Sequence, residues 1–218
     1  MAQVAEKIPW KTESYVSQVQ QHWPQTGKHI LAQYDDNSVV VYQAFRPEIA
    51  EYAVKNQRFG GPHYKWERMS WIKPNFLWMM YRCGWASKKA QERVLAVRIT
   101  RTGFDEILAN AYTPKTQAEA GLPKDQLKVR LQWDPDHDPS GTSLQRRAIQ
   151  LGLKGEILNH YAQDWIVSIT DVTDFVHEQY NVLQTSGTEQ LQVAAERVYQ
   201  VTDPKTKALI GVEDWATS

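Results

Sequence analysis

The chain has 218 residues with 25 Lys and Arg against 25 Asp and Glu, so its formal net charge is zero. A neutral chain has no overall positive field, which argues against a protein that coats duplex nucleic acid and limits anion binding to local patches. The single cysteine, Cys83, excludes an intramolecular disulfide framework, and no apolar run approaches the roughly 20 residues of a membrane helix, so we expect a cytoplasmic protein without a membrane partner.

The N-terminal part of the chain is predicted to form an arm, a hairpin and a helix. Ile8–Gly27 is polar and interrupted by two prolines, which predicts an arm or a short helix over Glu13–His22 within residues 1–27. Two β-rich runs, His29–Tyr34 and Ser38–Phe45, flank a turn composition and predict a hairpin. Pro47, followed by apolar residues at helical spacing, predicts a helix that ends before a pair of glycines.

The middle of the chain predicts two further helices around a strand. Pro74 can open a helix that runs to about Gly84. Val94–Thr100 is rich in β-branched residues and predicts a strand. Gly103–Tyr112 is predicted as a short helix, and the polar stretch Thr113–Asp125 as a loop.

The second half alternates between strands and helices in the same way. Leu127–Trp133 alternates like a strand and leads into the turn-forming run DPDHDPSG, after which Leu144–Leu153 is predicted as a helix. Trp165–Thr170 predicts a strand and Asp171–Tyr180 a helix. Arg197–Val212 predicts a hairpin centred on an Asp-Pro-Lys turn.

This order of elements indicates the α+β class, with a single mixed domain in which helices flank a central β-sheet. We expect the core to span residues 28–180, after the arm of residues 1–27. Residues 181–218 are expected to form a linker and a C-terminal hairpin packed on the core. Glycine-rich phosphate-binding motifs are absent from the sequence.

The segment Arg68–Trp85, RMSWIKPNFLWMMYRCGW, is unusually rich in tryptophan. Each buried indole N–H needs a hydrogen-bond partner, so dense tryptophan with interleaved cations favours a surface that binds flat rings or phosphates. The candidate ring-binding and cationic residues are Trp71, Trp78, Trp85, Tyr81, Lys73 and Arg82. The alternative interpretation is a tryptophan-rich core seam with its cations at the solvent edge.

Further cations extend this basic edge. Lys88, Lys89 and Arg93 follow the tryptophan segment, and Arg147 lies in the expected helix farther along the chain. These side chains could hold phosphate groups. The alternative for Arg147 is an ordinary solvent-exposed charged face.

The run QWDPDHDP offers carboxylates and an imidazole within a few residues. Its prolines favour a turn over a metal site, because aspartate is common in turns for its own backbone hydrogen bonds, and we predict no metal. His137 is a candidate general base, since its ordinary pKa suits proton transfer near neutral pH. Cys83 is expected to be a buried, inert thiol.

Four motifs carry a resemblance to a known family. VYQAF, RMSWIKPNFLWMMYRCGW, QWDPDH and RRAIQLGLKGE together resemble the bacterial domain-of-unknown-function family numbered 4291, over residues 28–175. That resemblance implies a shared fold, but the family has no established activity that could be transferred to this chain.

A second resemblance, to ADP-ribosyltransferase-like folds, rests on the order of elements and on GEIL followed by WIVSIT. It implies NAD as cofactor and Glu156 as the residue that polarises the nicotinamide ribose or activates the acceptor. The residues that it implies for NAD binding are Lys73, Trp78, Tyr81, Arg82 and, on an early strand, Tyr42 and Gln43.

Three functional hypotheses follow from the sequence. The first is an ADP-ribosyltransferase-like enzyme that uses NAD with a nucleotide or nucleic-acid acceptor. The second is a non-catalytic module that binds single-stranded nucleic acid or a nucleotide by stacking on tryptophans, where each stacked base contributes about 1–3 kcal/mol. The third makes the tryptophan seam purely structural. The sequence leaves the oligomeric state open.

Overall fold

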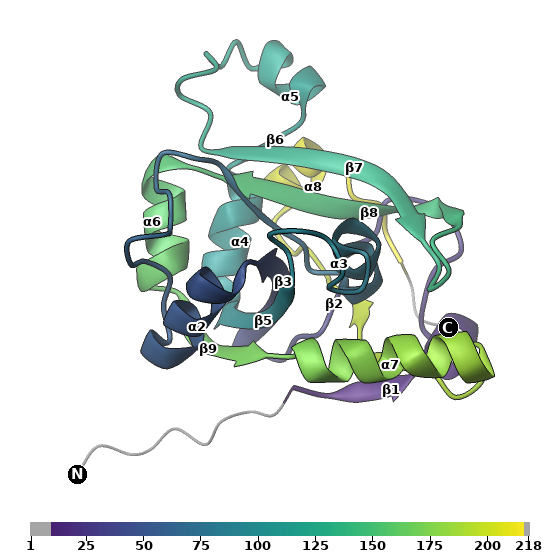
Figure 1. Ribbon diagram of the computed structural model, residues 1–218. Helices are drawn as coiled ribbons and strands as arrows, with labels where there is room; N and C mark the ends of the chain where they lie inside the picture. Colours follow the sequence, from purple (N-terminus) through teal and green to yellow (C-terminus); the bar gives the residue numbers. More distant parts are fainter. Residues whose placement is uncertain (1–9, 216–218) are drawn as a thin grey trace.

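A three-stranded antiparallel sheet separates two hydrophobic cores. The computed structural model describes residues 10–215. The sheet has the strand order β3-β5-β9 (Figure 1), with β3 (Ser38–Phe45), β5 (Arg93–Thr100) and β9 (Ile166–Asp171). Because successive side chains point to opposite faces, Val39 and Val41 enter one core, the first core, while Val40 enters the second core. Burial on both faces explains the near-continuous apolar sequences of β3 and β5.

A four-stranded sheet contributes one face to the first core. Its strands, in order, are β4 (Ser70–Ile72), β8 (Ser143–Leu153), β7 (Val129–His137) and β6 (Ala111–Tyr112). The pairs are antiparallel except β6 with β7, which is parallel. The backbone N–H of Tyr42 donates to the carbonyl of Lys73 at 2.7 Å, and this bridge joins the end of β4 to β3. The two sheets therefore meet along one edge.

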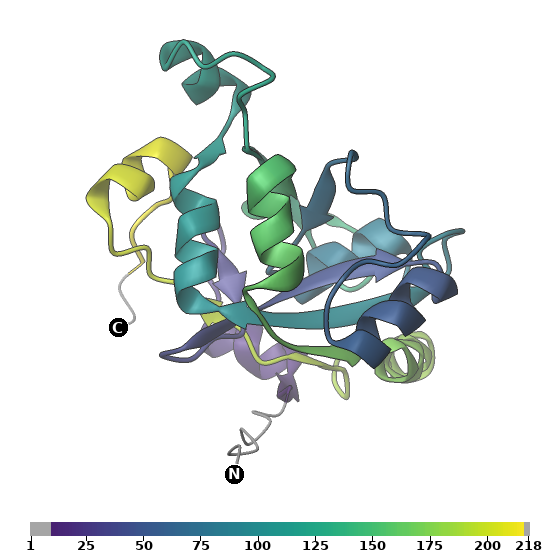
Figure 2. The same ribbon diagram turned by 90° about the vertical axis from the view of Figure 1, so that its left-hand side faces the viewer.

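Three helices each bury two or more apolar residues in the first core, namely α2 (Pro47–Asn56), α4 (Arg101–Ala109) and α6 (Gly155–Gln163). Helices α4 and α6 lie beside each other (Figure 2). Local signals start two of the helices. Pro47 occupies the first turn of α2, and the hydroxyl of Thr100 accepts from the N–H of Gly103 at the start of α4.

Two helices cover the second core, α3 (Phe76–Cys83) and α7 (Thr173–Ser186). Helix α3 has a signal at each end. The side chain of Asn75 accepts a hydrogen bond from the N–H of Trp78 at 2.6 Å, and Gly84 ends the helix in the left-handed conformation with φ of 59°. The sequence therefore fixes the position of α3 locally.

The two ends of the chain pair with each other. The elements involved are β1 (Thr12–Ser14), α1 (Tyr15–Gln21), β2 (Leu31–Ala32), β10 (Gln192–Ala194) and β11 (Arg197–Val198). Strand β1 pairs with β10 and β2 pairs with β11, both antiparallel. Two short helices complete the described chain, α5 (Pro114–Glu119), which projects from the body in both views, and α8 (Pro204–Ile210) (Figures 1 and 2).

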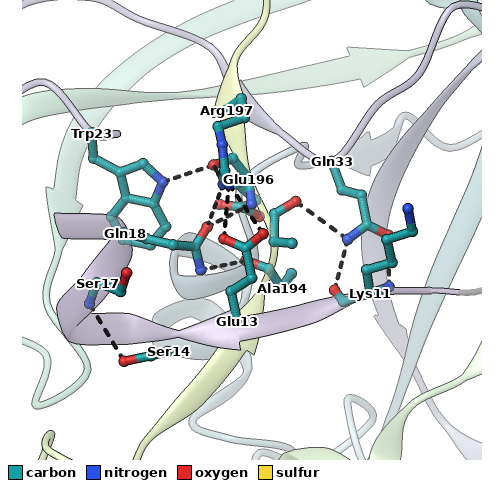
Figure 3. A network of polar contacts seen from close by, with 11 residues as sticks. Lys11, Glu13, Ser14, Ser17, Gln18, Trp23, Gln33, Ala194, Glu196 and Arg197 are labelled. Atoms are coloured by element: carbon teal, nitrogen blue, oxygen red, sulfur yellow. Dashed lines mark hydrogen bonds and ion pairs between the residues drawn. The ribbon is translucent and has the colours of Figure 1, made fainter. Parts of the chain in front are cut away.

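A network of polar contacts, here called the terminal clasp, holds these ends together (Figure 3). The fully buried Gln18 donates to the carbonyl of Ala194 at 3.0 Å and accepts from the N–H of Glu196 at 2.7 Å. The guanidinium of Arg197 pairs with the carboxylate of Glu13 at 2.9 Å. Since each bond joins residues more than 170 positions apart, the clasp ties the first strand of the fold to the last ones.

The clasp also reaches helix α3 through the carboxyl group of Glu196. One oxygen of this group accepts from the N–H of Phe76 at 2.6 Å and the other from the amide of Asn75 at 3.1 Å. Burial raises the pKa of Glu196 well above its usual range, although the hydrogen bond from Phe76 opposes that rise. The start of α3 is thus held by a side chain from the C-terminal part of the chain.

The segment Leu144–Leu153, which the sequence predicts as a helix, is strand β8, and this prediction is wrong. The strand pairs with β7 from Leu153 to Arg147 and again at Ser143, with an irregularity in between. Ile149 and Leu151 point into the first core, and Gly152 lies on the opposite face. The apolar spacing of RRAIQLGL is compatible with both a helix and a strand, so the pairing with β7 determines that the segment is a strand.

The hairpin predicted over Arg197–Val212 is also wrong, since this segment forms β11 and α8. The carboxylate of Asp203 accepts from the N–H of Thr206 at 2.8 Å, and Pro204 occupies the first turn of α8. An Asp-Pro pair can begin either a turn or a helix, and here it caps a helix.

Two smaller predictions differ from the structure. Thr113–Asp125, predicted as a loop, contains α5, which begins with a capping box at Thr113 and Thr116. The hairpin predicted before Phe45 is reduced to one bridge between Tyr34 and Val39, because β2 pairs with β11 instead.

The mixed α+β class is confirmed. The predicted helices at Glu13–His22, after Pro47 and after Pro74 correspond to α1, α2 and α3. Residue 180, the expected end of the core, lies inside α7. Within residues 10–215, no helix combines the length and the apolar character needed to cross a bilayer.

Gly103 on α4 is packed against a tryptophan ring. A Cβ atom at this position would lie 2.5 Å from Cγ of Trp165. We expect Gly103→Ala to lower the free energy of unfolding by about 1–3 kcal/mol through overpacking, although alanine favours a helix by about 1 kcal/mol. Urea denaturation measures this, with the exposed Thr102→Ala of the same helix as control. Equal midpoints for the two variants would contradict the close contact.

Candidate functional site

A pocket of about 340 Å³ lies where the end of β3, the start of α2 and the loop before β4 meet. We call it the loop pocket. Its lining residues are Phe45, Arg46, Ile49, His63, Tyr64, Lys65, Arg68, Met69, Ser70 and Ala90. Aromatic rings and cations therefore line the same cavity, in a chain whose total charge is zero. A cavity of this size is at the small end of ligand pockets.

Aromatic packing and two glycines shape the loop that lines this pocket. The ring of Tyr64 stacks on Phe59 with centroids 5.4 Å apart and an interplanar angle of 21°. Gly60 and Gly61 both have positive φ, and a Cβ atom at Gly61 would lie 2.7 Å from the ring of Tyr52. The loop needs glycine at this point because the ring of Tyr52 covers it.

Gln43, one of the predicted NAD-binding residues, is hydrogen-bonded to a residue that lines the loop pocket. Its amide donates to the hydroxyl of Ser70 at 2.8 Å and to the carbonyl of Trp71 at 3.1 Å. Its oxygen accepts from the hydroxyl of Tyr161 at 2.8 Å. These bonds use the amide group of Gln43 and fix Ser70, which lines the pocket.

Three buried polar atoms around the loop pocket have no hydrogen-bond partner within residues 10–215: the hydroxyl of Tyr64, Nε of Arg46 and Oε2 of Glu92. The other oxygen of Glu92 accepts from the N–H of Ala90, which lines the pocket, at 2.8 Å. Burial raises the pKa of Tyr64 to about 12, and the nearby Ser70 offsets only part of that rise. Nε of Arg46 has the carboxylate of Glu48 at ion-pair distance, 3.5 Å, which leaves the hydroxyl of Tyr64 and Oε2 of Glu92. An unpartnered buried polar group costs about 1–3 kcal/mol, so two beside one cavity indicate a site built for a polar ligand.

The charges around the loop pocket are mixed but mainly positive. Arg46, Lys65 and Arg68 line it, and Nε of Arg46 lies 3.5 Å from the carboxylate of Glu48. Glu92 adds a half-buried carboxylate, since it directly precedes Arg93, which pairs with Phe45 at the end of β3, next to Arg46. An anion with hydroxyl groups matches this combination of donors and acceptor.

The model of a protein family, described as a domain of unknown function (DUF4291), matches residues 29–199. The chain belongs to the DUF4291 family. The match spans both sheets and every residue that lines the loop pocket. The search of curated proteins found no match to the chain.

Two of the predicted ring-binding residues of this DUF4291 protein, Trp78 and Tyr81, stack with each other and with His137. The rings of Tyr81 and His137 are parallel within 12° with centroids 3.5 Å apart, and Trp78 lies 5.3 Å from His137. Trp78 is only 4% exposed, and its indole N–H has no partner within residues 10–215. For Trp78 the core interpretation therefore fits better than a base-stacking surface. Tyr81 is 40% exposed and remains accessible.

Trp71 and Trp85 lie in different places. Trp71 is half-buried on β4, opposite Gly152 of β8, where a Cβ atom would lie 3.0 Å from its ring. Trp85 is buried behind the end of α3, 5.7 Å from the ring of Tyr180. The three predicted tryptophans of the DUF4291 chain thus do not form one continuous platform.

Lys73 is buried beside α3 and is 6% exposed. Burial, followed by the charge of Arg82, lowers its pKa to about 8. Its ammonium forms no hydrogen bond or ion pair within residues 10–215, although Asp134 and Cys83 lie near enough to oppose the lowering of the pKa. Arg82 itself is exposed. Neither side chain lines the loop pocket.

The other predicted phosphate-binding cations are separated from one another. Lys88 donates to the carbonyl of Arg82 at 2.9 Å at the end of α3. Arg93 pairs with Asp171, with its Nε 2.7 Å from the carboxylate. Arg147 is exposed on β8. The predicted basic edge is therefore not one continuous patch: Lys88 caps a helix, Arg93 is in an ion pair, and Arg147 lies on open surface.

The two predicted catalytic residues lie far apart in the DUF4291 fold. The exposed Glu156 pairs with Lys128 at 2.8 Å, which lowers the pKa of the carboxyl group, and both line another pocket of about 580 Å³. His137 ends β7, whereas Lys128 precedes it, so roughly 30 Å of extended chain separates them. Tyr42 is buried, and its hydroxyl accepts from Trp10 at 2.9 Å. The structure does not bring Glu156 and His137 into one site.

Sequence reasoning missed Arg46, Tyr64 and Glu92. The only local signal is the glycine pair followed by alternating aromatic and basic residues in GGPHYKW. The last pair of β3 with β5, Phe45 with Arg93, brings their neighbours Arg46 and Glu92 to the same end of the sheet, which no local pattern reveals. Among residues 10–215, no cluster of three or more His, Cys, Asp or Glu side chains could hold a metal ion.

Proposed function

We propose that this DUF4291 protein binds NAD in the loop pocket and acts as an ADP-ribosyltransferase-like enzyme with a nucleotide or nucleic-acid acceptor. The observation that carries the proposal is a cation-lined pocket beside which two buried polar groups, the hydroxyl of Tyr64 and Oε2 of Glu92, make no hydrogen bond or ion pair within residues 10–215. A guanidinium, a phenol and a carboxylate correspond to the phosphates and ribose hydroxyls of a nucleotide, and the aromatic wall corresponds to its flat ring.

Each side chain then has a role that follows from its chemistry. Arg46 and Arg68 hold the pyrophosphate as charged donors, with Lys65 at the rim. The rings of Phe45 and Tyr64 pack against the nicotinamide. Since about 340 Å³ is small for a dinucleotide, one nucleotide half of NAD enters the pocket and the other lies over the cationic rim.

The carboxylate of Glu92 replaces Glu156 as the candidate catalytic group in this proposal. In the transfer, the bond between nicotinamide and ribose breaks with its electron pair leaving on nicotinamide. The acceptor oxygen or nitrogen bonds to the same ribose carbon and releases its proton to a base. A carboxylate beside the ribose stabilises the positive charge that develops there. Glu92 has a free oxygen beside the pocket, whereas Glu156 lines another one.

Thermal unfolding with NAD tests binding. At about 100 times the dissociation constant, a ligand adds about 2.7 kcal/mol of stability, which raises the midpoint by about 5–10 °C for a chain of this size. We expect Arg68→Ala to weaken NAD binding about tenfold or more. The exposed Arg58→Ala, from the same segment but outside the pocket, serves as matched control and should bind NAD normally.

Nicotinamide release then tests catalysis. We expect Glu92→Gln to lower the rate about 100-fold while NAD still raises the unfolding midpoint, and Glu156→Gln to leave the rate unchanged. The reverse pattern would return the catalytic role to Glu156. An unfolding midpoint that does not change with millimolar NAD would reject the proposal. A midpoint that rises with oligonucleotides but not with NAD would favour the nucleic-acid-binding alternative.

A further inference from the structure

A second pocket, of about 550 Å³, lies between the end of α3, the tip of the β7–β8 hairpin and α7. We call it the hairpin pocket. Figure 1 shows these three elements next to one another. The pocket shares no lining residue with the loop pocket, so whatever it binds is independent of the NAD proposal.

Three aromatic rings line the hairpin pocket: Tyr81, Trp85 and Tyr180. Tyr81 and Tyr180 are 40% and 41% exposed, which is unusual for large rings in this chain. The face of an aromatic ring carries partial negative charge, so rings that converge on one cavity attract cations.

The polar groups of the hairpin pocket are also negative. One oxygen of Asp138 accepts from the hydroxyl of Ser140 at 2.6 Å and from the N–H of Thr142 at 2.9 Å. Its other oxygen has no hydrogen bond or ion pair within residues 10–215. The C-terminal end of α3, where carbonyl groups concentrate negative charge, borders the pocket at Gly84. None of the described residues that line the pocket is Lys, Arg or His.

The chain itself places an ammonium group at the rim of this pocket. Nζ of Lys88 donates to the carbonyls of Arg82 at 2.9 Å and Tyr81 at 3.4 Å, and it lies 5.9 Å from the centroid of the Tyr81 ring. This side chain shows the type of group that the helix end and the ring attract. Lys88 is exposed and has a long, flexible side chain, so a cation that binds more tightly can displace its ammonium group.

We propose that the hairpin pocket binds a small organic cation, an amine or a quaternary ammonium compound. The rings of Trp85 and Tyr180 supply the cage, and the free oxygen of Asp138 supplies the counter-charge. A quaternary ammonium group fits such a cage because it is large, weakly hydrated and needs no hydrogen-bond acceptor.

Calorimetric titration of the whole chain with tetramethylammonium tests the proposal, with sodium chloride holding the ionic strength constant. The neutral tert-butanol, similar in size, serves as a shape control. We expect saturable binding of tetramethylammonium and none of tert-butanol. Equal binding of the two, or no saturable binding of tetramethylammonium, would overturn the proposal.

Variants locate the binding. Asp138→Asn keeps the oxygen that Ser140 and Thr142 use, so the hairpin is preserved, and we expect about fivefold weaker binding. Tyr180→Leu should weaken binding similarly, whereas Tyr180→Phe should not. Glu178→Gln removes an exposed carboxylate from α7 outside the pocket and should have no effect. Equal losses for Asp138→Asn and Glu178→Gln would reduce the effect to general charge attraction and reject a specific site.

Discussion

Replacing Arg146 by alanine is expected to lower the free energy of unfolding by about 3–5 kcal/mol. The guanidinium of Arg146 pairs with Asp136 at 2.7 Å, and the two side chains are 4% and 2% exposed. The same guanidinium donates to the carbonyl of Pro24 at 2.6 Å and lies 5.4 Å from the centroid of the Trp23 ring. Alanine leaves the carboxylate of Asp136 buried without its counter-charge. Urea denaturation measures the loss.

The neighbouring Arg147→Ala is the matched control for this prediction. Arg147 is exposed, and its side chain makes no hydrogen bond or ion pair within residues 10–215, so we expect a change within about 0.5 kcal/mol. Replacing Arg146 by Met and Asp136 by Leu together should recover much of the loss, because no buried charge remains. If Arg146→Ala is as mild as Arg147→Ala, the ion pair is not buried as described.

Replacing Lys73 by methionine is expected to stabilise the protein at pH 7 by about 3 kcal/mol. Lowering the pKa of a buried lysine from 10.5 to about 8 corresponds to that free energy. Between these two pH values the unfolded chain binds more protons than the native one, so stability rises with pH through the contribution of Lys73. Methionine has a similar unbranched stem and no charge to bury. Urea denaturation across this pH range measures the effect.

The effect of Lys73 is measured by the difference in the free energy of unfolding between Lys73→Met and the unchanged protein, because other groups titrate equally in both. It should be largest below pH 8 and vanish towards pH 10.5. Lys89→Met, at an exposed lysine of the same region, should leave stability unchanged at every pH. A gain for Lys73→Met that does not vary with pH would mean that the ammonium is solvated rather than buried.

Local signals were sufficient for the elements that start and stop within a few residues. Pro47, Asn75 and Gly84 set the ends of α2 and α3, and β-branched runs gave β3 and β5. Strand β8 could not be predicted in this way, because its choice between helix and strand depends on pairing with β7. The Asp-Pro signal before α8 is ambiguous for a similar reason, since turns and helix starts use the same residues.

The candidate site was harder to predict than the fold. The sequence drew attention to the tryptophan segment, yet Trp78 lies in the interior and stacks with His137. Composition reveals how many aromatic and charged residues a segment has, and not which side of a helix faces water. Arg46 and Glu92 are 46 positions apart, and only the pairing of their neighbours Phe45 and Arg93 shows that they lie at the same end of the sheet.

The terminal clasp has a consequence for synthesis of the protein in the cell. The side chain of Gln18 has its hydrogen-bond partners in residues 194–197, and the indole N–H of Trp23 has its partner in Glu196, so during translation these N-terminal side chains emerge long before the groups that satisfy them. Domains usually begin to fold as they leave the ribosome, but contacts of such large sequence separation form late. Residues 10–33 therefore stay open to chaperones and proteases until most of the chain has been made.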